Sequence, residues 1–409
     1  MLGEFLVKRI KFLSRFNIPA PVASGLLVSL LVLAVNVADI APIKLATKVD
    51  EKWWTWLVTT EIDWKNAPKL DIYRPFQVAF FTLIGLNASW ALAKRGGIQA
   101  IIFLALASVF AVVQNVVGVG LAKVLGVEPL LGVVCGAVTL TGGHSTAMGF
   151  ADELLKAGLK NAGEIGIAAA TFGLVAGGLL GGGLGGMLIR KNQLKPAASS
   201  GTHLEMGSSG ESGILKDFKA LKSFGGQFVL HLILLLACIK VGAWVSYFIQ
   251  KTGVSFPIYI GAMILGVVVR NLFDAAGLRW IRTEIVDTLA SVMLGLFLTI
   301  AMMSLNLIDL AAVATPMLII LLVQVIVMAL FAWFITFRLM GRDFDAAVMA
   351  GGHCGFGMGA TSNAIASMKA LVENYGPAPR AFLIVPIVGA FLIDFPNALI
   401  ITVFINLYK

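Results

Sequence analysis

Residues 350–361 read AGGHCGFGMGAT, which places five glycines, a histidine and a cysteine in a run that is otherwise apolar enough for a membrane span. Glycine lets the chain turn and lets its backbone face a solute. Within a bilayer, backbone that lacks internal hydrogen bonds is tolerated only where it lines a cavity or is buried in protein. The stretch therefore predicts a re-entrant segment over residues 345–362, which enters the membrane and returns on the same side.

The composition is that of a membrane protein. Of the 409 residues, 58% are hydrophobic and 13% are charged, and the mean hydropathy is +0.91. Apolar stretches recur at about the 20 residues that a helix needs to cross the hydrocarbon, whereas barrel strands alternate in short segments. We predict an all-α polytopic membrane protein. The net charge of +9 lies in short clusters between apolar runs, so we expect no nucleic-acid partner.

A polar stretch rich in Ser, Gly and Lys divides the apolar runs into two groups. We interpret residues 191–225 as a cytoplasmic linker between two membrane repeats, 1–190 and 226–409. Each repeat carries one re-entrant loop, at 128–150 and at 345–362. The spans are expected at residues 19–39, 75–93, 97–125, 164–189, 226–250, 256–270, 286–306, 312–338 and 380–406.

Short motifs recur between the two repeats. Clusters of Lys and Arg usually lie on the cytoplasmic side of a membrane. All of the clusters in this chain can be cytoplasmic only if both glycine-rich segments are re-entrant. The two repeats then have inverted topology. The first repeat lacks the leading helix that residues 226–250 supply in the second. The matching motifs are PVASG at 21–25 with PIYIG at 257–261, VQN at 113–115 with VQV at 323–325, and GGH at 142–144 with GGH at 351–353.

A short helical pattern follows each glycine-rich stretch, beginning near Thr146 and near Ser362, with Ser145 and Thr361 as the expected N-caps. Two such helix starts facing each other would offer N–H groups and a partial positive charge to an anion such as a carboxylate. Close helix packing is the alternative role for glycine. We prefer it for the glycines at four-residue spacing, which are Gly177, Gly181 and Gly185.

Polar groups inside apolar spans are costly and mark functional candidates. Asp394 and Asn397 lie together in AFLIDFPNALI, with a buried structural hydrogen bond as the alternative. The equivalent histidines His144 and His353 are expected to fix the loops by hydrogen bonding, since one His per repeat with Cys354 lacks a metal ligand set. We expect no cofactor and no metal beyond a sodium ion. Its candidate ligands are Thr139, Thr141, Asn87, Asn115, Asp394 and Asn397.

At these motifs the chain resembles the glutamate:sodium symporter family of bacterial inner membranes, and more distantly the 2-hydroxycarboxylate transporters. The resemblance implies a homodimeric, multi-pass secondary transporter that takes up L-glutamate with sodium, and whose transport domain moves past a scaffold by alternating access. The family's first loop usually has more glycine where Ser145 and Ala147 stand here. The resemblance rests on AGGHCGFGMGATSNAIASM, TLTGGHSTAMG, NIPAPVASGLL, TLIGLNA, VVQNVVGVG, TFGLVAGGL and VGAFLIDFPNALI.

The resemblance also implies that the two loops face substrate and sodium. Gln114 and Gln324 match across the repeats and join the loop residues as candidates for substrate binding. The candidate set is Gly142, Gly143, His144, Ser145, Thr146, Gly352, His353, Cys354, Gly355, Gly357, Gly359, Thr361, Gln114 and Gln324.

Two other functions fit the sequence. The first is a passive channel, or a carrier, for another small organic anion, because no arginine is evident near either loop to pair with the second carboxylate of glutamate. The second is a membrane enzyme that uses Cys354 as nucleophile and His353 as base. The repeated GGH without a second cysteine argues against the enzyme.

Overall fold

The structure is a computed structural model, which describes residues 2–15, 18–37, 48–49, 51–60, 70–196, 224–252, 257–278, 280–303 and 313–409. Most of the predicted linker, 197–223, lies outside the described residues. The chain forms two compact units. Unit 1 consists of Met1–Ala91 with Ser212–Ala311, and unit 2 of Leu92–Glu211 with Ala312–Lys409. Each unit therefore takes one segment from each of the two sequence halves.

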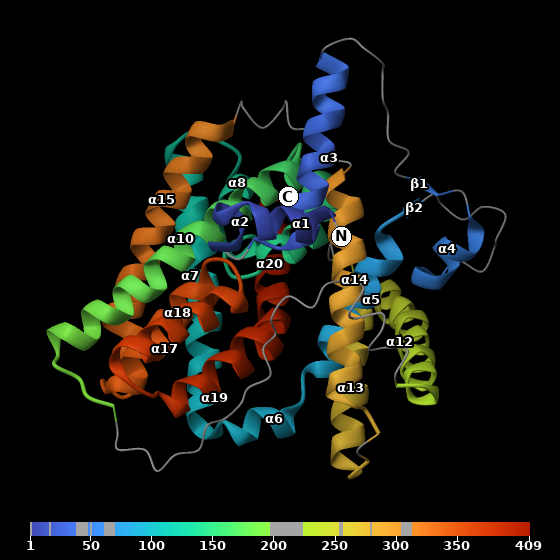
Figure 1. The fold of residues 1–409 in the computed structure, drawn as a ribbon. Coiled ribbons are helices and arrows are strands. Elements are labelled where there is room, and N and C mark those ends of the chain that lie inside the picture. The colour runs from blue at the N-terminus through green and yellow to red at the C-terminus, as the bar shows by residue number, and fades with distance from the viewer. Residues whose placement is uncertain are drawn as a thin grey trace. The chain divides into compact units, whose positions relative to one another are not determined.

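Unit 1 is built around one short, buried helix, α5, which packs against α13 and α14. Helix α12 packs on α13, and α3 packs on α14 (Figure 1). Strands β1 and β2 form a two-residue antiparallel ladder that the sequence did not predict. The described elements are α1 (Leu2–Arg9), α2 (Lys11–Arg15), α3 (Ala20–Val37), β1 (Lys48–Val49), α4 (Lys52–Val58), β2 (Leu70–Asp71), α5 (Arg74–Asn87), α12 (Gly226–Gln250), α13 (Ile260–Ala275) and α14 (Thr283–Met303).

The predicted span at 75–93 is not one helix. Helix α5 ends at Asn87, and α6 (Trp90–Arg95), which crosses the boundary between the units in sequence, begins after two non-helical residues. The amide of Asn271 on α13 explains the break, because its Nδ2 donates to the carbonyl of Ala88 at 2.9 Å and its Oδ1 accepts from the N–H of Trp90 at 2.8 Å. A side chain thus replaces the helical partners of these two backbone groups.

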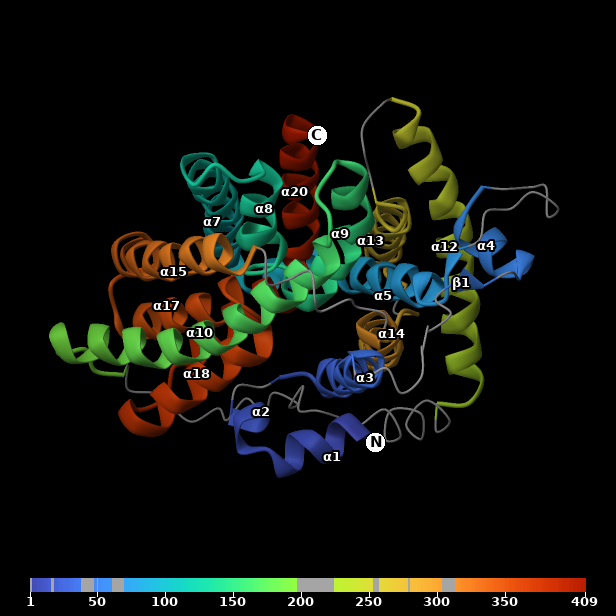
Figure 2. The ribbon, with the colours of Figure 1, turned by 90° about the horizontal axis from the view of Figure 1, so that it is seen from above.

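Unit 2 is built around the long helix α10, which packs against α9, α17 and α18. Helices α10, α17 and α18 lie together in both views (Figure 1 and Figure 2). The described elements are α7 (Gly97–Val124), α8 (Pro129–Val133), the π-helical turn η1 (Val134–Val138), α9 (Gly143–Lys156), α10 (Ala162–Lys191), α15 (Ala314–Phe331), the π-helical turn η3 (Ala332–Thr336), α16 (Phe337–Leu339), α17 (Phe344–Gly357), α18 (Thr361–Tyr375), α19 (Pro379–Ile387), the π-helical turn η4 (Val388–Leu392) and α20 (Asp394–Tyr408).

The packing role predicted for three glycines of α10 is confirmed. A β-carbon at Gly181 would lie 2.6 Å from the carbonyl oxygen of Gly351 on α17, and one at Gly177 would lie 3.1 Å from that of Cys354. At Gly185 it would overlap the side chain of Leu371 on α18. Because no side chain intervenes, the backbones of α10 and α17 approach closely.

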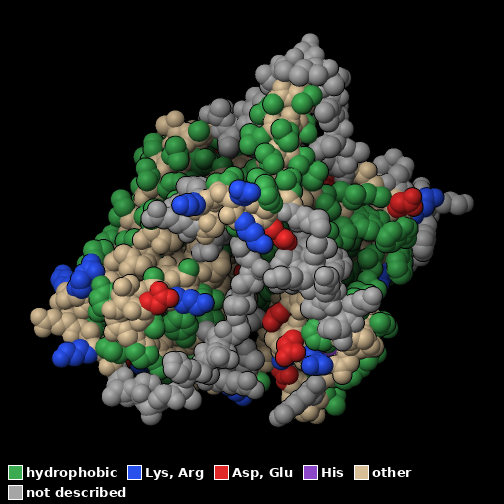
Figure 3. All heavy atoms as spheres, in the orientation of Figure 1, with side chains coloured by type: hydrophobic (Ala, Val, Ile, Leu, Met, Phe, Trp, Pro, Cys, Tyr) green, Lys and Arg blue, Asp and Glu red, His purple; other side chains and the backbone are tan. Residues whose placement is uncertain are grey.

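Within the described residues, five helices are long and apolar enough to cross a membrane, or six if the pair α19 and α20, bent by 45°, counts as one span. The helices expected at 97–125, 164–189, 226–250, 286–306 and 312–338 are among them. The helices at the other predicted spans are shorter, with 18 residues in α3 and 16 in α13. Hydrophobic side chains cover the exposed surfaces of α3 and α15, as a lipid environment requires (Figure 3).

We expect Asn271→Ala to lower the melting temperature of the protein in detergent, because it leaves the backbone groups of Ala88 and Trp90 unpaired. The cost should be about 0.5–1.5 kcal/mol for each lost hydrogen bond, because the bond to Ala88 is only partly buried and the bond to Trp90 is exposed. Asn374→Ala is the matched control, since Asn374 donates to the carbonyl of Ala370 four residues earlier, as Asn271 does to that of Val267, and this bond lies within its own helix. Equal melting temperatures for the two variants would contradict this explanation of the break.

Candidate functional site

Two helix interruptions lie in unit 2, one in each glycine-rich segment. The first break comprises residues 139–142, between η1 and α9, and is preceded by a non-helical glycine, Gly136 (φ −106°, ψ −131°). The second break comprises residues 358–360, between α17 and α18, where Ala360 is extended. The predicted pattern of an interruption followed by a new helix is therefore present in both segments.

The predicted N-caps are wrong. Helix α9 begins at Gly143, whose positive φ of 66° suits glycine, so Ser145 is already inside the helix. Helix α18 begins at Thr361, whose hydroxyl donates to the carbonyl of Gly389 at 2.7 Å and so caps nothing. Neither helix start has a side-chain cap, which leaves first-turn N–H groups for other partners.

The two breaks touch each other. A β-carbon at Gly143, at the end of the first break, would lie 2.8 Å from the carbonyl oxygen of Gly359 in the second. Both breaks also contact α10, since a β-carbon at Gly173 would lie 2.5 Å from the carbonyl oxygen of Met358 and 2.8 Å from the Leu140 side chain. The two uncapped helix starts thus meet beside the middle of α10.

Gln114 on α7 connects the two breaks. Its Nε2 donates to the carbonyl of Gly357 at 2.8 Å, and its Oε1 accepts from the hydroxyl of Thr141 at 2.6 Å. The matching glutamine on α15, Gln324, donates through Nε2 to the backbone carbonyl of Gln114 at 2.7 Å. The structure therefore brings together the two glutamines that the repeat comparison singled out.

Two asparagines hold the peptide groups of Ala137, which follows Gly136. Asn115 Oδ1, from α7, accepts from the N–H of Ala137 at 2.9 Å, and Asn397 Nδ2, from α20, donates to its carbonyl at 3.2 Å. Both side chains are buried. Asn115 here supplies a partner for the N–H group, whereas Asn397 adds a second donor to a carbonyl that also accepts from the N–H of Gly142.

The hydroxyls of the first break have their protons engaged. Thr139 donates to the carbonyl of Val134 at 2.6 Å, and Thr141 donates to Gln114. The oxygen lone pairs of both residues therefore point away from those partners. Asp394, the acidic residue among the candidate sodium ligands, is the first residue of α20 and directly follows the bend from α19. Its carboxylate has no hydrogen-bond or ion-pair partner within the described part of the chain.

Both candidate histidines make the hydrogen bonds expected of them. The hydroxyl of Thr171 on α10 donates to Ile167, so His144 Nε2 must donate to that hydroxyl, at 3.0 Å. His353 Nδ1 lies 2.9 Å from the hydroxyl of Thr336 in η3, and its Nε2 is buried without a partner among the described residues. The ring of His353 is surrounded by those of Phe103, Phe110, Phe331 and Phe356.

Some of the glycines predicted to bind substrate make close packing contacts. A β-carbon at Gly355 would lie 2.5 Å from the Cα of Ala364 on α18, and one at Gly352 would lie 2.7 Å from the sulfur of Met368. Cys354 is fully buried. These residues hold α17 against α18, whereas Gly357 contributes its carbonyl to Gln114.

Asn87 lies in unit 1, whereas the other candidate residues lie in unit 2. Its Nδ2 donates to Asp287 Oδ1 of α14 at 2.7 Å. Asp274 accepts from Arg270 and from Ser89 nearby in the same unit. Asn87 is thus part of a polar cluster that holds the end of α5.

The sequence interpretation missed three polar residues that make hydrogen bonds near the breaks and the histidines. Asn363, the third residue after the second break, donates to the carbonyl of Leu174 at 2.6 Å. Its place as a buried amide in the first turn of a helix is a usable signal. Thr171 and Thr336, the partners of the histidines, give no such signal, because hydroxyls in apolar helices commonly bond the carbonyl of the preceding turn.

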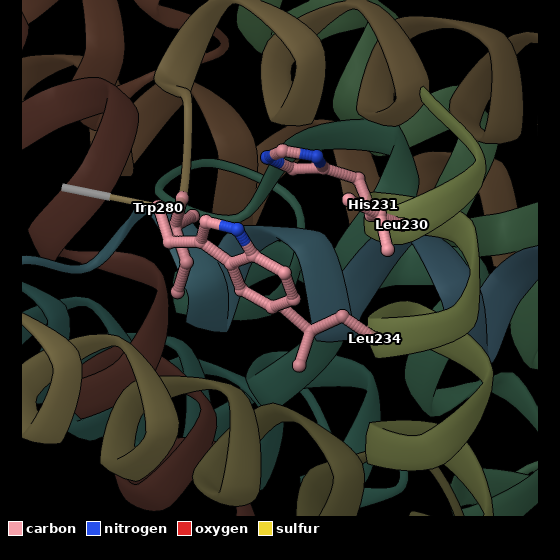
Figure 4. Close-up of a pocket in the computed structure, with 5 residues that line it drawn as sticks. Leu230, His231, Leu234 and Trp280 are labelled. Carbon is pink, nitrogen blue, oxygen red and sulfur yellow. The ribbon is translucent and has the colours of Figure 1, made fainter. Parts of the chain in front are cut away.

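A small hollow in unit 1 is not a substrate site. Leu230, His231 and Leu234 of α12 line it with Trp280 and Ile281 (Figure 4). His231 accepts from the N–H of Arg282 at 3.0 Å through Nε2, so its Nδ1 carries the proton and donates to Gln227. The ring has both nitrogens bonded to backbone and fastens the chain before α14 to α12.

Comparison with known proteins identifies relatives over the full chain. A family model described as sodium/glutamate symporter matches residues 1–377. The sodium/glutamate symporter of Escherichia coli (strain K12) is 38% identical over 418 aligned residues, covering 100% of this chain and 94% of that protein. The sodium/glutamate symporter of Haemophilus influenzae is 36% identical over 404, covering 98% of this chain and 93% of that protein.

We expect Gly355→Ala to destabilise the protein, because the added carbon would overlap the backbone of α18. Overpacking of this kind costs about 1–3 kcal/mol. Gly182→Ala is the control on α10, where a β-carbon meets nothing within 4 Å, and it should be neutral or slightly stabilising. Thermal unfolding in detergent measures both, and an unchanged melting temperature for Gly355→Ala would refute the packing role.

Proposed function

The chain belongs to the sodium/glutamate symporter family, and we propose that unit 2 binds glutamate and sodium where its two breaks meet. The protein is a multi-pass membrane protein that performs sodium-coupled glutamate symport and is not an enzyme. The observation that supports the site is the contact between Gly143 and Gly359, which brings two uncapped helix starts together.

The electrostatics of this arrangement suit an anionic amino acid. Helix starts without a side-chain cap, and the positive ends of the α9 and α18 dipoles, favour carboxylates. Sodium takes the oxygens that remain, for which the lone pairs of Thr139 and Thr141 and the unpaired carboxylate of Asp394 are the best-supported ligands. The proposal leaves out Asn87, because it lies in unit 1, where its Nδ2 donates to Asp287, whereas the two breaks lie in unit 2.

We further propose that the chain consists of inverted repeats with re-entrant loops. The composition of the units supports this, because each unit pairs a segment of one half with the matching segment of the other. Helix α3 of the first half packs on α14 of the second, and α13 of the second half packs on α5 of the first. These two contacts are equivalent if α3 corresponds to α13 and α5 to α14, as the PVASG and PIYIG motifs suggest.

The same division supports an elevator-like mechanism, in which unit 2 carries the solutes and unit 1 acts as the scaffold. All of the proposed ligands lie in unit 2, so the site can move as one body. We also propose a homodimer in the inner membrane of a bacterial cell, since the relatives are bacterial symporters.

Uptake into vesicles tests the proposed function. Purified protein in liposomes should accumulate labelled glutamate against its gradient when sodium is high outside, and should cease to do so when the sodium gradient is collapsed. Unlabelled aspartate and other organic anions, added as competitors, define the substrate range. Downhill flux that is independent of sodium would instead indicate a passive channel or carrier for a small anion.

We expect Asp394→Asn to weaken sodium binding, because it removes the unpaired charge that follows the bend before α20. The sodium concentration for half-maximal glutamate uptake should rise by about tenfold or more, as a charged hydrogen-bond acceptor contributes about 1.5–3 kcal/mol. Glu373→Gln, an exposed acid on α18, is the control. An unchanged sodium dependence in Asp394→Asn would remove this residue from the ion site.

A further inference from the structure

The amide orientations of Asn115 and Asn397 are determined by backbone groups. An amide usually allows two assignments of oxygen and nitrogen, which neighbouring polar groups must decide. Here the N–H of Ala137 can only donate, so Asn115 must present its oxygen to it, and the carbonyl of Ala137 can only accept, so Asn397 must present its nitrogen. Gln324 is determined in the same way by the carbonyl of Gln114.

The other ends of these three amides have no partner in the part of the chain that the structure describes. Asn115 is left with a buried donor, Nδ2, whereas Asn397 and Gln324 are each left with a buried acceptor oxygen. All three side chains are at most 1% exposed. A buried polar atom without a partner costs about 1–3 kcal/mol, so three of them together point to a ligand that supplies the missing hydrogen bonds.

These amides lie around one point of the backbone, the non-helical Gly136. A β-carbon at Gly136 would lie 2.7 Å from Asn115 Oδ1 and 3.0 Å from the carbonyl oxygen of Gln114. That carbonyl accepts from Gln324, and the next residue, Ala137, is held by Asn397. One interruption therefore gathers the amides of α7, α15 and α20.

The unpaired atoms match the two charged groups on the α-carbon of an amino acid. Sodium would use the two acceptor oxygens but would leave the donor of Asn115 unpaired, and a dicarboxylate would use the donor but neither acceptor. We propose that Asn115 Nδ2 donates to a carboxylate of the substrate, while Asn397 Oδ1 and Gln324 Oε1 accept from its α-ammonium group. This inference rests on the proposed function and names the residues that select an amino acid over a dicarboxylate of the same length.

The inference assigns Asn115 and Asn397 to substrate binding, whereas the sequence alone predicted them as sodium ligands. It also separates the amide that donates to a carboxylate, Asn115, from the two amides that accept from the ammonium group, Asn397 and Gln324. Loss of an acceptor should harm only substrates with an ammonium group, whereas loss of the donor should harm every carboxylate. Glutarate, which is glutamate without its amino group, distinguishes the two effects.

The test measures the KM for glutamate and the inhibition constant for glutarate in liposomes at saturating sodium. Gln324→Met and Asn397→Leu should each raise the KM for glutamate by about 10- to 100-fold and leave the inhibition constant of glutarate within about twofold. Asn115→Asp, which keeps the acceptor for Ala137 but loses the donor, should raise both constants together. Asn363→Leu is the control for the loss of a buried amide, and it should leave the ratio of the two constants unchanged.

Three outcomes would overturn the inference. If Gln324→Met and Asn397→Leu shift the sodium dependence and raise both constants alike, their oxygens hold sodium. If the constants do not change in either variant, the amides bind only water. If Asn363→Leu changes the ratio as strongly as they do, the effect is structural. Failure of the proposed function itself is distinguishable, because the unmodified protein would then show no sodium-dependent uptake.

Discussion

Interrupted backbone in an apolar surrounding must find hydrogen-bond partners, and this requirement shapes the whole of unit 2. Each unpaired backbone group inside a bilayer costs several kcal/mol. The side chains of Gln114, Asn115 and Asn397 supply partners for the peptide groups of Gly357 and Ala137. Because these amides come from α7 and α20, the helices that enclose the breaks also hold them in place, and breaks and bundle depend on each other.

The sequence predicted the helices and the interruptions well, because both follow from composition. Long apolar runs gave α7, α10, α12, α14 and α15, and runs of glycine marked both breaks. It failed where a distant side chain decided the outcome. The end of α5 depends on Asn271, which is 183 residues away from Ala88. The helix starts were misplaced because a glycine with positive φ, Gly143, allowed α9 to begin before the expected cap at Ser145.

The sequence likewise predicted one part of the candidate site and not another. Residue types and the matched motifs identified Gln114, Gln324, Asn115 and Asn397, but not which atom of each amide is already used, since that depends on the contacts of Ala137 and Gln114. Glycine gave a mixed signal. Gly143 meets the second break, whereas Gly355 is required by the packing of α17 on α18. A glycine-rich motif therefore contains a residue at which the two breaks meet and residues that allow helices to approach each other.

Unit 2 has no obvious arginine to pair with the second carboxylate of glutamate, and the proposed site uses neutral amides instead. The arginines of unit 2 whose contacts are described lie at helix ends, where Arg190 donates to Tyr375 Oη and Arg380 to Asp343. A buried arginine would bind a carboxylate tightly and would remain costly when the site is empty. Amides and helix starts carry no full charge and keep part of their hydrogen bonding without substrate. A transporter must release what it binds, so a site of this kind suits repeated loading and emptying.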